Sequence, residues 1–163
     1  MTNAVSAATS RPSTHASEAA ALAWAARVFA ELPVAALLKA QPLGCDPQLG
    51  RMLVRFEAQR AFCNLMGTVQ GGMLAAMLDL AMAFAVLCTL EDGYVVPSLE
   101  MKTSFVAPAR AGAITGEGWI LRKGRSVTFM EGRLLDPEGN LLATASATGA
   151  LRLRPPPAAT DRA

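Results

Sequence analysis

The chain has 163 residues, a length that suits a single domain, and 52% of them are hydrophobic, which is enough for a sizeable core. It carries 15 Lys and Arg against 13 Asp and Glu, and this net charge of +2 at pH 7 predicts no strong attraction to nucleic acid or to an anionic membrane surface. Aromatic residues make up only 6%, so an exposed platform for base stacking is not expected either.

Cysteine and histidine limit the chemistry that the chain can perform. Cys45, Cys63 and Cys88 are far apart and odd in number, so neither a disulfide framework nor a zinc site is indicated. This use of cysteine fits a reduced cytoplasmic setting. The single histidine, His15, lies in a Ser-, Thr-, Ala- and Pro-rich segment that we expect to be unfolded, so a carboxylate, an amide or the backbone must carry any catalysis.

Both ends of the chain predict tails. Residues 1–16 are acid-poor and share the composition of a transit peptide, but they lack the apolar core of a secretory signal, and we favour a disordered tail. The sequence PPPAATDRA over residues 155–163 predicts a second tail, because proline cannot donate to a strand ladder. A single domain is therefore expected over residues 17–154.

The first half of this domain predicts two helices, a loop and a strand. Ser17 is suited to cap the first helix and Pro33 to stop it. The segment QPLGCDPQLG is rich in Pro and Gly and predicts a loop, whereas RMLVRFEAQ alternates and predicts a strand. In chain order, the expected elements cover residues 17–31, 33–40, 41–50 and 51–59.

A long apolar run extends from residue 72 to residue 90, and its length alone would admit a membrane span. Asp79 near its middle would then cost roughly 2.5–3.5 kcal/mol on an insertion scale. No basic cluster flanks the run, and strands of a globular domain follow it. A helix that is hydrophobic on every side can equally be the buried helix of a globular protein, which is the interpretation we favour.

The apolar run ends at residue 90, and after residue 94 apolar and polar residues begin to alternate with a period of two. In VVPSLEMKTSF the odd-numbered positions from Val95 to Phe105 share one face, while Ser98 and Glu100 share the other, more polar face. The turn DPEGN predicts a hairpin in which Gly139 adopts a positive φ. Four strands in an antiparallel meander are expected, over residues 95–105, 111–122, 126–136 and 141–154.

These elements predict an α+β domain with the hotdog fold. One antiparallel sheet wrapped around one long central helix buries both partners, and an N-terminal helical segment precedes them.

The stretch CNLMGTVQGGMLAAMLDLAMAFAV resembles the motif of hotdog-fold acyl-CoA thioesterases of the PaaI-like family. The later stretches VPSLEMKTSFVAPARAG and GRSVTFMEGRLLDPEGNLLATASAT resemble strands of the same family, so the resemblance covers about residues 50–153. Gln70 departs from the pattern, because the family usually has a histidine there. The positions that match the motif are Asn64, Gly67, Gly71, Gly72 and Asp79.

The expected start of the long helix suits the stabilisation of an oxyanion. Thioester hydrolysis turns a carbonyl oxygen into an anion, and helix N-termini offer unpaired N–H groups and a partial positive charge. Gly71 and Gly72 have no Cβ, so a substrate can approach the backbone there, although the pair could also serve only as a tight helix start. An amide at Gln70 can donate an N–H but cannot transfer a proton as a histidine does.

The resemblance implies that Asp79 is the nucleophile or the general base, whereas the alternative is a structural buried acid. It also implies that Asn64 holds the carbonyl or orients its loop, and an Asx turn is the alternative. Ser98 matches a residue that assists the attacking water, although it could be only a polar strand residue. Arg110 and Arg125 could meet the phosphates of coenzyme A, or could simply be solvated.

Helix geometry adds a constraint on how such a site is assembled. Eight residues separate Gly71 from Asp79, or about 12 Å at the rise of an α-helix. One carbonyl therefore cannot contact both groups of one chain, and we expect a homodimer or homotetramer with shared sites, as the resemblance also implies.

The expected activity is hydrolysis of an acyl- or aroyl-CoA to the free acid and coenzyme A. No metal or cofactor is expected, since coenzyme A is part of the substrate, and neither a membrane nor a nucleic acid is expected as partner. The alternatives are an acyl-CoA-binding protein without catalysis and a hydratase or dehydratase, which usually pairs an acid with a folded histidine.

Overall fold

The computed structural model describes residue 15 and residues 17–154, so the rest of the two expected tails lies outside the described residues. Its elements are α1 (Glu18–Glu31), α2 (Pro33–Leu37), β1 (Gln41–Asp46), β2 (Arg51–Ala58), the 3₁₀ turn η1 (Arg60–Phe62), α3 (Gly71–Leu87), β3 (Tyr94–Val95), β4 (Ser98–Phe105), β5 (Gly112–Lys123), β6 (Val127–Leu135), β7 (Leu141–Ala150) and β8 (Arg152–Leu153).

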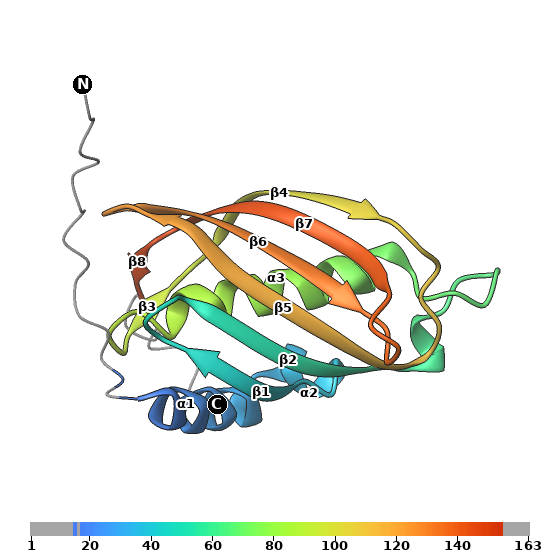
Figure 1. Cartoon of the computed structure of the whole chain (residues 1–163), viewed down its shortest axis with the longest axis horizontal. Helices are drawn as coiled ribbons and strands as arrows, with labels where there is room; N and C mark the ends of the chain where they lie inside the picture. Colours follow the sequence, from blue (N-terminus) through green and yellow to red (C-terminus); the bar gives the residue numbers. More distant parts are fainter. Residues whose placement is uncertain (1–14, 16, 155–163) are drawn as a thin grey trace, which may run out of the picture.

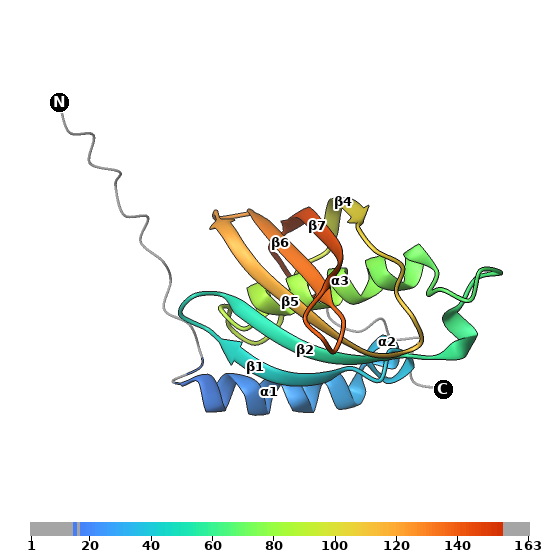
Figure 2. The ribbon, with the colours of Figure 1, turned by 45° about the vertical axis from the view of Figure 1, so that its right-hand side comes forward.

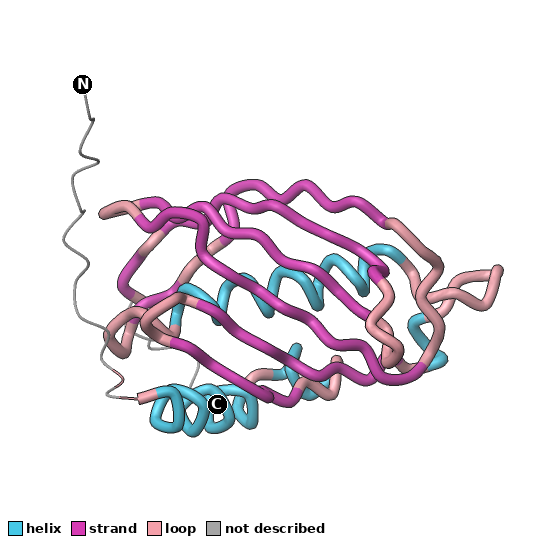
Figure 3. The backbone as a smooth tube through the Cα atoms, viewed as in Figure 1, coloured by secondary structure: helices cyan, strands magenta, loops and turns pink. Residues whose placement is uncertain are grey.

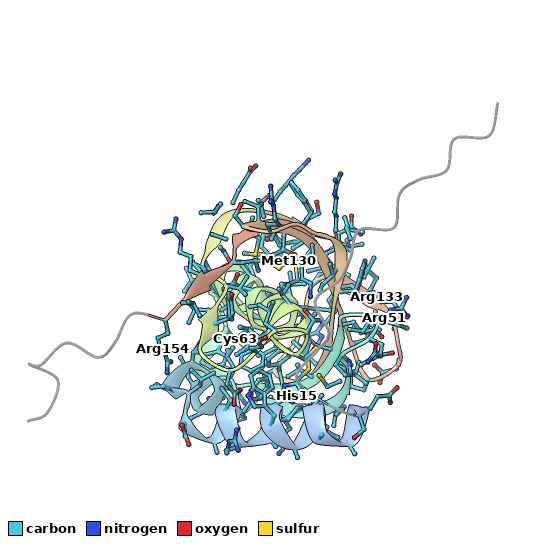
Figure 4. All side chains as sticks on the ribbon, turned by 90° about the vertical axis from the view of Figure 1, so that its left-hand side faces the viewer. His15, Arg51, Cys63, Met130, Arg133 and Arg154 are labelled. Atoms are coloured by element: carbon cyan, nitrogen blue, oxygen red, sulfur yellow. The ribbon has the colours of Figure 1, made fainter. Side chains whose placement is uncertain are left out.

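The main sheet has six strands in the order β1-β2-β5-β6-β7-β4, and every neighbouring pair is antiparallel. The sheet curls around α3, which runs along its hollow side (Figure 1, Figure 3). Seen along the helix, the strands arch over α3 and α1 crosses below it (Figure 4). The predicted hotdog fold is confirmed.

Helix α3 is apolar on every side, as its composition predicts, and nine of its residues are buried. Among the described residues, no helix combines the length and apolar character needed to cross a membrane. The helix lies close to the sheet because Gly118 of β5 and Gly132 of β6 face each other beneath it. A Cβ on Gly118 would collide with the main-chain carbonyl of Ala81, and one on Gly132 would lie 2.9 Å from the side chain of Met82.

Helix α1 begins as predicted, with the Ser17 hydroxyl accepting a hydrogen bond from the N–H of Ala20 at 3.2 Å. It lies along β1 and β2 (Figure 2). Phe29 meets the ring of Phe84 on α3 edge to face, with 4.5 Å between ring centroids. The ring of His15 packs on Trp24 at 5.1 Å, and the rest of the segment that was expected to be unfolded lies outside the described residues. His15 lies on the α1 side of the molecule (Figure 4).

The expected loop at residues 41–50 is wrong in its first part, because β1 forms there as an edge strand. Pro42 is tolerated because β1 pairs only with β2 and its register shifts between Pro42 and Gly44. The turn that follows is closed by Asp46, whose Oδ1 accepts hydrogen bonds from the N–H groups of Gln48 and Leu49 at 2.8 and 2.9 Å.

The expected four-stranded meander is correct only for β5, β6 and β7. Strand β4 does not pair with β5, which follows it in sequence, but with β7 at the edge of the sheet. The hairpin between β6 and β7 has the predicted turn, with Gly139 at a φ of +86°. The last expected strand is divided, because β8 leaves the main sheet and pairs with β3.

The contact between α3 and the sheet gives a prediction about stability. Gly118→Ala should lower the free energy of unfolding by about 1–3 kcal/mol, because the added Cβ has to displace helix backbone rather than a flexible side chain. Urea unfolding followed by circular dichroism measures this. Gly44→Ala is the matched control, since its Cβ would lie 3.7 Å from the nearest atom, in ordinary contact. Equal losses in both variants would contradict this account.

Candidate active site

The first part of the candidate site is the start of α3. Gln70 is the N-cap residue, and its exposed side chain makes no capping hydrogen bond. Its carbonyl oxygen accepts a hydrogen bond from the N–H of Met73 at 2.9 Å. Within the described chain, the N–H groups of Gly71 and Gly72 donate to no protein acceptor, so both remain available to an anionic oxygen.

The second part of the site is the carboxylate of Asp79 on the middle of α3. Asp79 is half-buried, and its Oδ1 accepts a hydrogen bond of 2.5 Å from the hydroxyl of Ser98. The sequence placed Ser98 on the face of Glu100, but the register of β4 shifts between these two residues. This irregularity turns the Ser98 side chain toward α3, so the predicted face of Ser98 is wrong. Its expected part in assisting the attacking water stays a prediction.

Strand β4 connects the two parts of the site. It begins at Ser98 beside Asp79 and ends at Phe105, whose ring lies over Gly71. A Cβ on Gly71 would lie 2.8 Å from the Cζ atom of Phe105, so the absent side chain leaves room for this ring. Strand β4 therefore runs antiparallel to α3 along one side of the helix.

A half-buried stripe of α3 lies between these two ends, because the chain's own sheet does not cover it completely. Small side chains dominate the stripe, as the sequence around Asp79 indicates. Its members are Gly71, Ala75, Ala76, Asp79 and Ala83.

Asn64 holds the loop that leads into α3. Its Oδ1 accepts hydrogen bonds from the N–H of Met66 at 2.9 Å, the N–H of Thr68 at 3.3 Å and the hydroxyl of Thr68 at 3.2 Å. This is the Asx-type arrangement that the sequence left open. The exposed loop projects beyond the end of the sheet (Figure 2).

The two predicted arginines lie at different ends of the molecule. Arg110 follows Ala109, whose carbonyl oxygen accepts a hydrogen bond from Val69 just before α3. Arg125 lies in the turn between β5 and β6. Both are exposed, and neither forms an ion pair with any described residue. The structure therefore brings Arg110, but not Arg125, to the start of α3.

Comparison with known proteins agrees with this geometry. The model of the thioesterase superfamily matches residues 66–143, which contain α3 and most of the sheet. A phenylacetic acid degradation-related protein of Ralstonia eutropha is 39% identical and has a TM-score of 0.72, with 76% of this chain and 96% of that chain covered. The chain belongs to the thioesterase superfamily. Its resemblance to the PaaI-like members is thereby confirmed.

Two named relatives extend the comparison. A protein of Saccharolobus solfataricus that is named as an esterase is 32% identical over 96 residues, which are 59% of this chain and 68% of that protein. Human acyl-coenzyme A thioesterase 13 is 28% identical over 81 residues, which are 49% of this chain and 57% of the human protein. Thioester hydrolysis is thus the chemistry of the family to which the chain belongs.

Sequence reasoning missed two features of the thioesterase-like site. The ring of Phe105 over Gly71 was not expected, although the alternation of β4 could have placed it on the helix side. Leu65 and Met66 stand exposed at the tip of the loop before α3, which an apolar pair between Asn64 and Gly67 could have indicated. In the described part of the chain, no group of three or more His, Cys, Asp or Glu side chains could hold a metal ion.

The role of Asn64 can be measured without substrate. Asn64→Ala removes the acceptor of the Met66 and Thr68 amides, so both should exchange with deuterium faster, while the free energy of unfolding falls by about 1 kcal/mol. Hydrogen exchange resolved by NMR gives both rates.

A matched control for this measurement is Asn140→Ala, which disturbs a distant turn closed by hydrogen bonds from Asn140 to Asp136. It should leave the Met66 and Thr68 amides unchanged. Unchanged exchange in Asn64→Ala would mean that the loop does not depend on this side chain.

Proposed function

We propose that the protein hydrolyses the thioester of an acyl- or aroyl-CoA to the free acid and coenzyme A. The observation that carries this proposal is the placement of the Asp79 carboxylate, bonded to Ser98, on a helix that begins with two unpaired N–H groups. A carboxylate next to a hydroxyl can prepare a nucleophile, and free helix N–H groups can hold the oxyanion that results. Family membership and the name of the human relative give independent support.

In this mechanism the thioester carbonyl oxygen accepts a hydrogen bond from the Gly71 N–H. Asp79 then either attacks the carbonyl carbon or removes a proton from a water molecule that attacks it. Negative charge develops on the carbonyl oxygen at the helix N-terminus, where the helix dipole and the N–H stabilise it. The C–S bond breaks as the carbonyl reforms, and coenzyme A leaves. When water is the nucleophile, the acyl product is already the free acid; when Asp79 is the nucleophile, water then hydrolyses the mixed anhydride, which releases the free acid and restores the carboxylate. Ser98 keeps the Asp79 carboxylate oriented by its hydrogen bond.

The site is proposed to form between two protomers. Gly71 and Asp79 of one chain are about 12 Å apart along α3, which is too far for one thioester carbonyl. Strand β4 is a free edge of the sheet. Antiparallel pairing of two β4 strands about a twofold axis would bring the Ser98 end of one strand beside the Phe105 end of the other. Asp79 would then face the partner's Gly71.

The surface around β4 supports this pairing. Leu99, Phe105 and Val106 are each more than half exposed on the single chain, which is unusual for large apolar side chains gathered at a sheet edge. Leu65 and Met66 are also exposed, in the loop before α3. A second copy of the chain would bury this surface. A homodimer would bury this apolar surface, and a homotetramer built from two such dimers would do so as well.

Other parts of the proposal follow from the same residues. Gln70 can donate an amide N–H toward the thioester, Gly72 offers a second backbone donor, and Arg110 lies where phosphates of coenzyme A could be bound near α3. Arg125 lies at the other end of the sheet, so it could reach these phosphates only from the partner subunit. Reaction without a metal or cofactor, and a cytoplasmic location, remain predictions.

The central prediction concerns Asp79. Asp79→Asn should lower kcat on the best substrate of an acyl-CoA panel by about 100-fold or more, because the amide neither attacks nor takes a proton. Release of free thiol measures turnover, and circular dichroism checks the fold. Glu100→Gln is the matched control, since Glu100 lies on the same strand as Ser98 but is exposed and faces away from α3.

The outcomes of this assay separate the two functional candidates. Turnover by the wild type that collapses only in Asp79→Asn supports the enzyme. Tight acyl-CoA binding without turnover by the wild type would favour the acyl-CoA-binding protein and would direct attention to Gln70. Equal activity of Asp79→Asn and wild type would contradict the role assigned to the carboxylate.

A second prediction tests the helix N-terminus and the sharing of sites. Gly71→Pro removes the N–H but suits the first position of a helix, and Gln70 already has the extended backbone, φ −60° and ψ 134°, that precedes proline well. Its kcat should fall by about 100-fold relative to Gly71→Ala, which adds a Cβ but keeps the N–H.

Mixing subunits then shows whether sites are shared. Co-expressed Gly71→Pro and Asp79→Asn chains should recover about a quarter of wild-type activity, because half of randomly formed dimers are mixed and each has one intact site. No recovery above the two parent variants would mean that each chain supplies both groups to its own site.

A further inference from the structure

Two cysteines that the proposed function does not use lie together inside the protein. Cys45 is on β1 and Cys88 is the C-cap residue of α3. They are 5% and 0% exposed, so neither is a surface thiol. The Cys88 thiol donates a hydrogen bond to the carbonyl oxygen of Ala85 at 3.2 Å, and its sulfur lies 3.9 Å from the carbonyl oxygen of Asp46, the residue next to Cys45. The two thiols are thus near enough for each to shift the pKa of the other.

The environments of the two thiols differ. The hydrogen bond from Cys88 lowers the pKa of the Cys45 thiol, although burial and the carboxylates of Asp46 and Glu18 act in the opposite direction. The same hydrogen bond and burial raise the pKa of Cys88, against a smaller opposing effect of the Lys123 ammonium. Cys45 is therefore the better nucleophile of the pair, and Cys88 is placed to react with it afterwards.

A hollow leads toward Cys45 from outside. Cys45 belongs to the wall of a cavity of about 590 Å³ that β1, β2 and β5 line together with the start of α1. Arg51 and Arg133 stand on this side of the molecule, outside the sheet (Figure 4). A small oxidant can occupy a cavity of this size, whereas Cys88 has no exposed surface and does not line the cavity.

We propose that Cys45 and Cys88 form a reversible disulfide when the folded protein meets a hydroperoxide. The Cys45 thiolate attacks one oxygen of the hydroperoxide, so that an S–O bond forms, the O–O bond breaks and the remaining oxygen leaves as an alcohol or water after protonation. Cys45 is now a sulfenic acid. The Cys88 sulfur attacks the Cys45 sulfur, the S–O bond breaks, and the hydroxide takes the Cys88 proton and leaves as water.

This disulfide would act on the element that carries the active site. It would close the segment between residues 45 and 88, which contains the loop of Asn64, the start of α3 at Gly71 and the carboxylate of Asp79. The same end of α3 is already held by Lys123, whose Nζ donates hydrogen bonds to the hydroxyl of Thr89 at 2.7 Å and to its carbonyl oxygen at 3.2 Å. Oxidation would thus link the edge strand β1 covalently to the C-terminal end of α3, which Lys123 already holds in place.

Treatment of the reduced full-length protein with hydrogen peroxide tests the proposal. The number of titratable thiols should fall from three to one, and peptide mass spectrometry without reduction should find Cys45 linked to Cys88, with Cys63 left free. Dithiothreitol should restore all three. In denaturing urea, where the fold no longer selects the pair, linkages that include Cys63 should appear as well.

Variants distinguish the two roles. Cys88→Ser should let the sulfenic acid on Cys45 accumulate, where dimedone traps it, and Cys45→Ser should leave Cys88 unoxidised. Cys63→Ser is the control and should still form the disulfide. Three titratable thiols after peroxide treatment of the folded wild type, or a linkage through Cys63 alone, would overturn the proposal without bearing on thioester hydrolysis.

Discussion

Helix α3 is apolar on every side, and each Å² of such surface left in water costs about 25 cal/mol, so the helix has to be enclosed rather than laid on a flat sheet. Enclosure requires a curled sheet and a close approach between helix and strands. The glycine pair Gly118 and Gly132 provides the approach, because the main chain of α3 lies where a Cβ on Gly118 would stand and the Met82 side chain lies where one on Gly132 would stand. The orientation of the helix is thereby fixed, and with it the side on which Asp79 remains half-buried.

The sheet of one chain does not enclose α3 completely, and the half-buried stripe that contains Asp79 remains uncovered. Strand β4 lies at one edge of the sheet, and it runs antiparallel to α3 from Asp79 to Gly71. The carboxylate and the free N–H groups therefore lie at opposite ends of one edge. A twofold axis beside that edge exchanges the ends, which is the simplest way to bring an acid and an oxyanion site together without bending the helix. Pairing with a second copy of the chain would account for three features together. These are the free edge of β4, the apolar surface beside it and the distance between the carboxylate and the N–H groups.

Sequence signals correctly predicted the elements that a short stretch of the chain determines by itself. The apolar run located α3, Ser17 located the start of α1, and Gly139 located a turn that needs positive φ. Features set by distant parts of the chain were not predictable in this way. The place of β4 beside β7 depends on pairing between residues that lie far apart in the sequence, from Phe105 with Ala143 to Ser98 with Gly149, and the direction of Ser98 depends on a register shift within that pairing. Candidate residues were therefore found by motif, whereas their mutual placement needed the fold.

The replacement of a histidine by Gln70 is compatible with thioester hydrolysis for a reason that lies in the substrate. An alkyl thiol has a pKa near that of cysteine, about 8.5, so coenzyme A can leave as a thiolate without receiving a proton in the transition state. The reaction then needs one group to prepare the nucleophile and one donor for the oxyanion. In the proposed mechanism Asp79 and the Gly71 N–H fill these two positions, and an amide at Gln70 needs only to orient the thioester. An oxygen ester, whose alkoxide leaves far less readily, would require an acid that this site lacks, so the residues at the start of α3 favour thioesters by chemistry as well as by family.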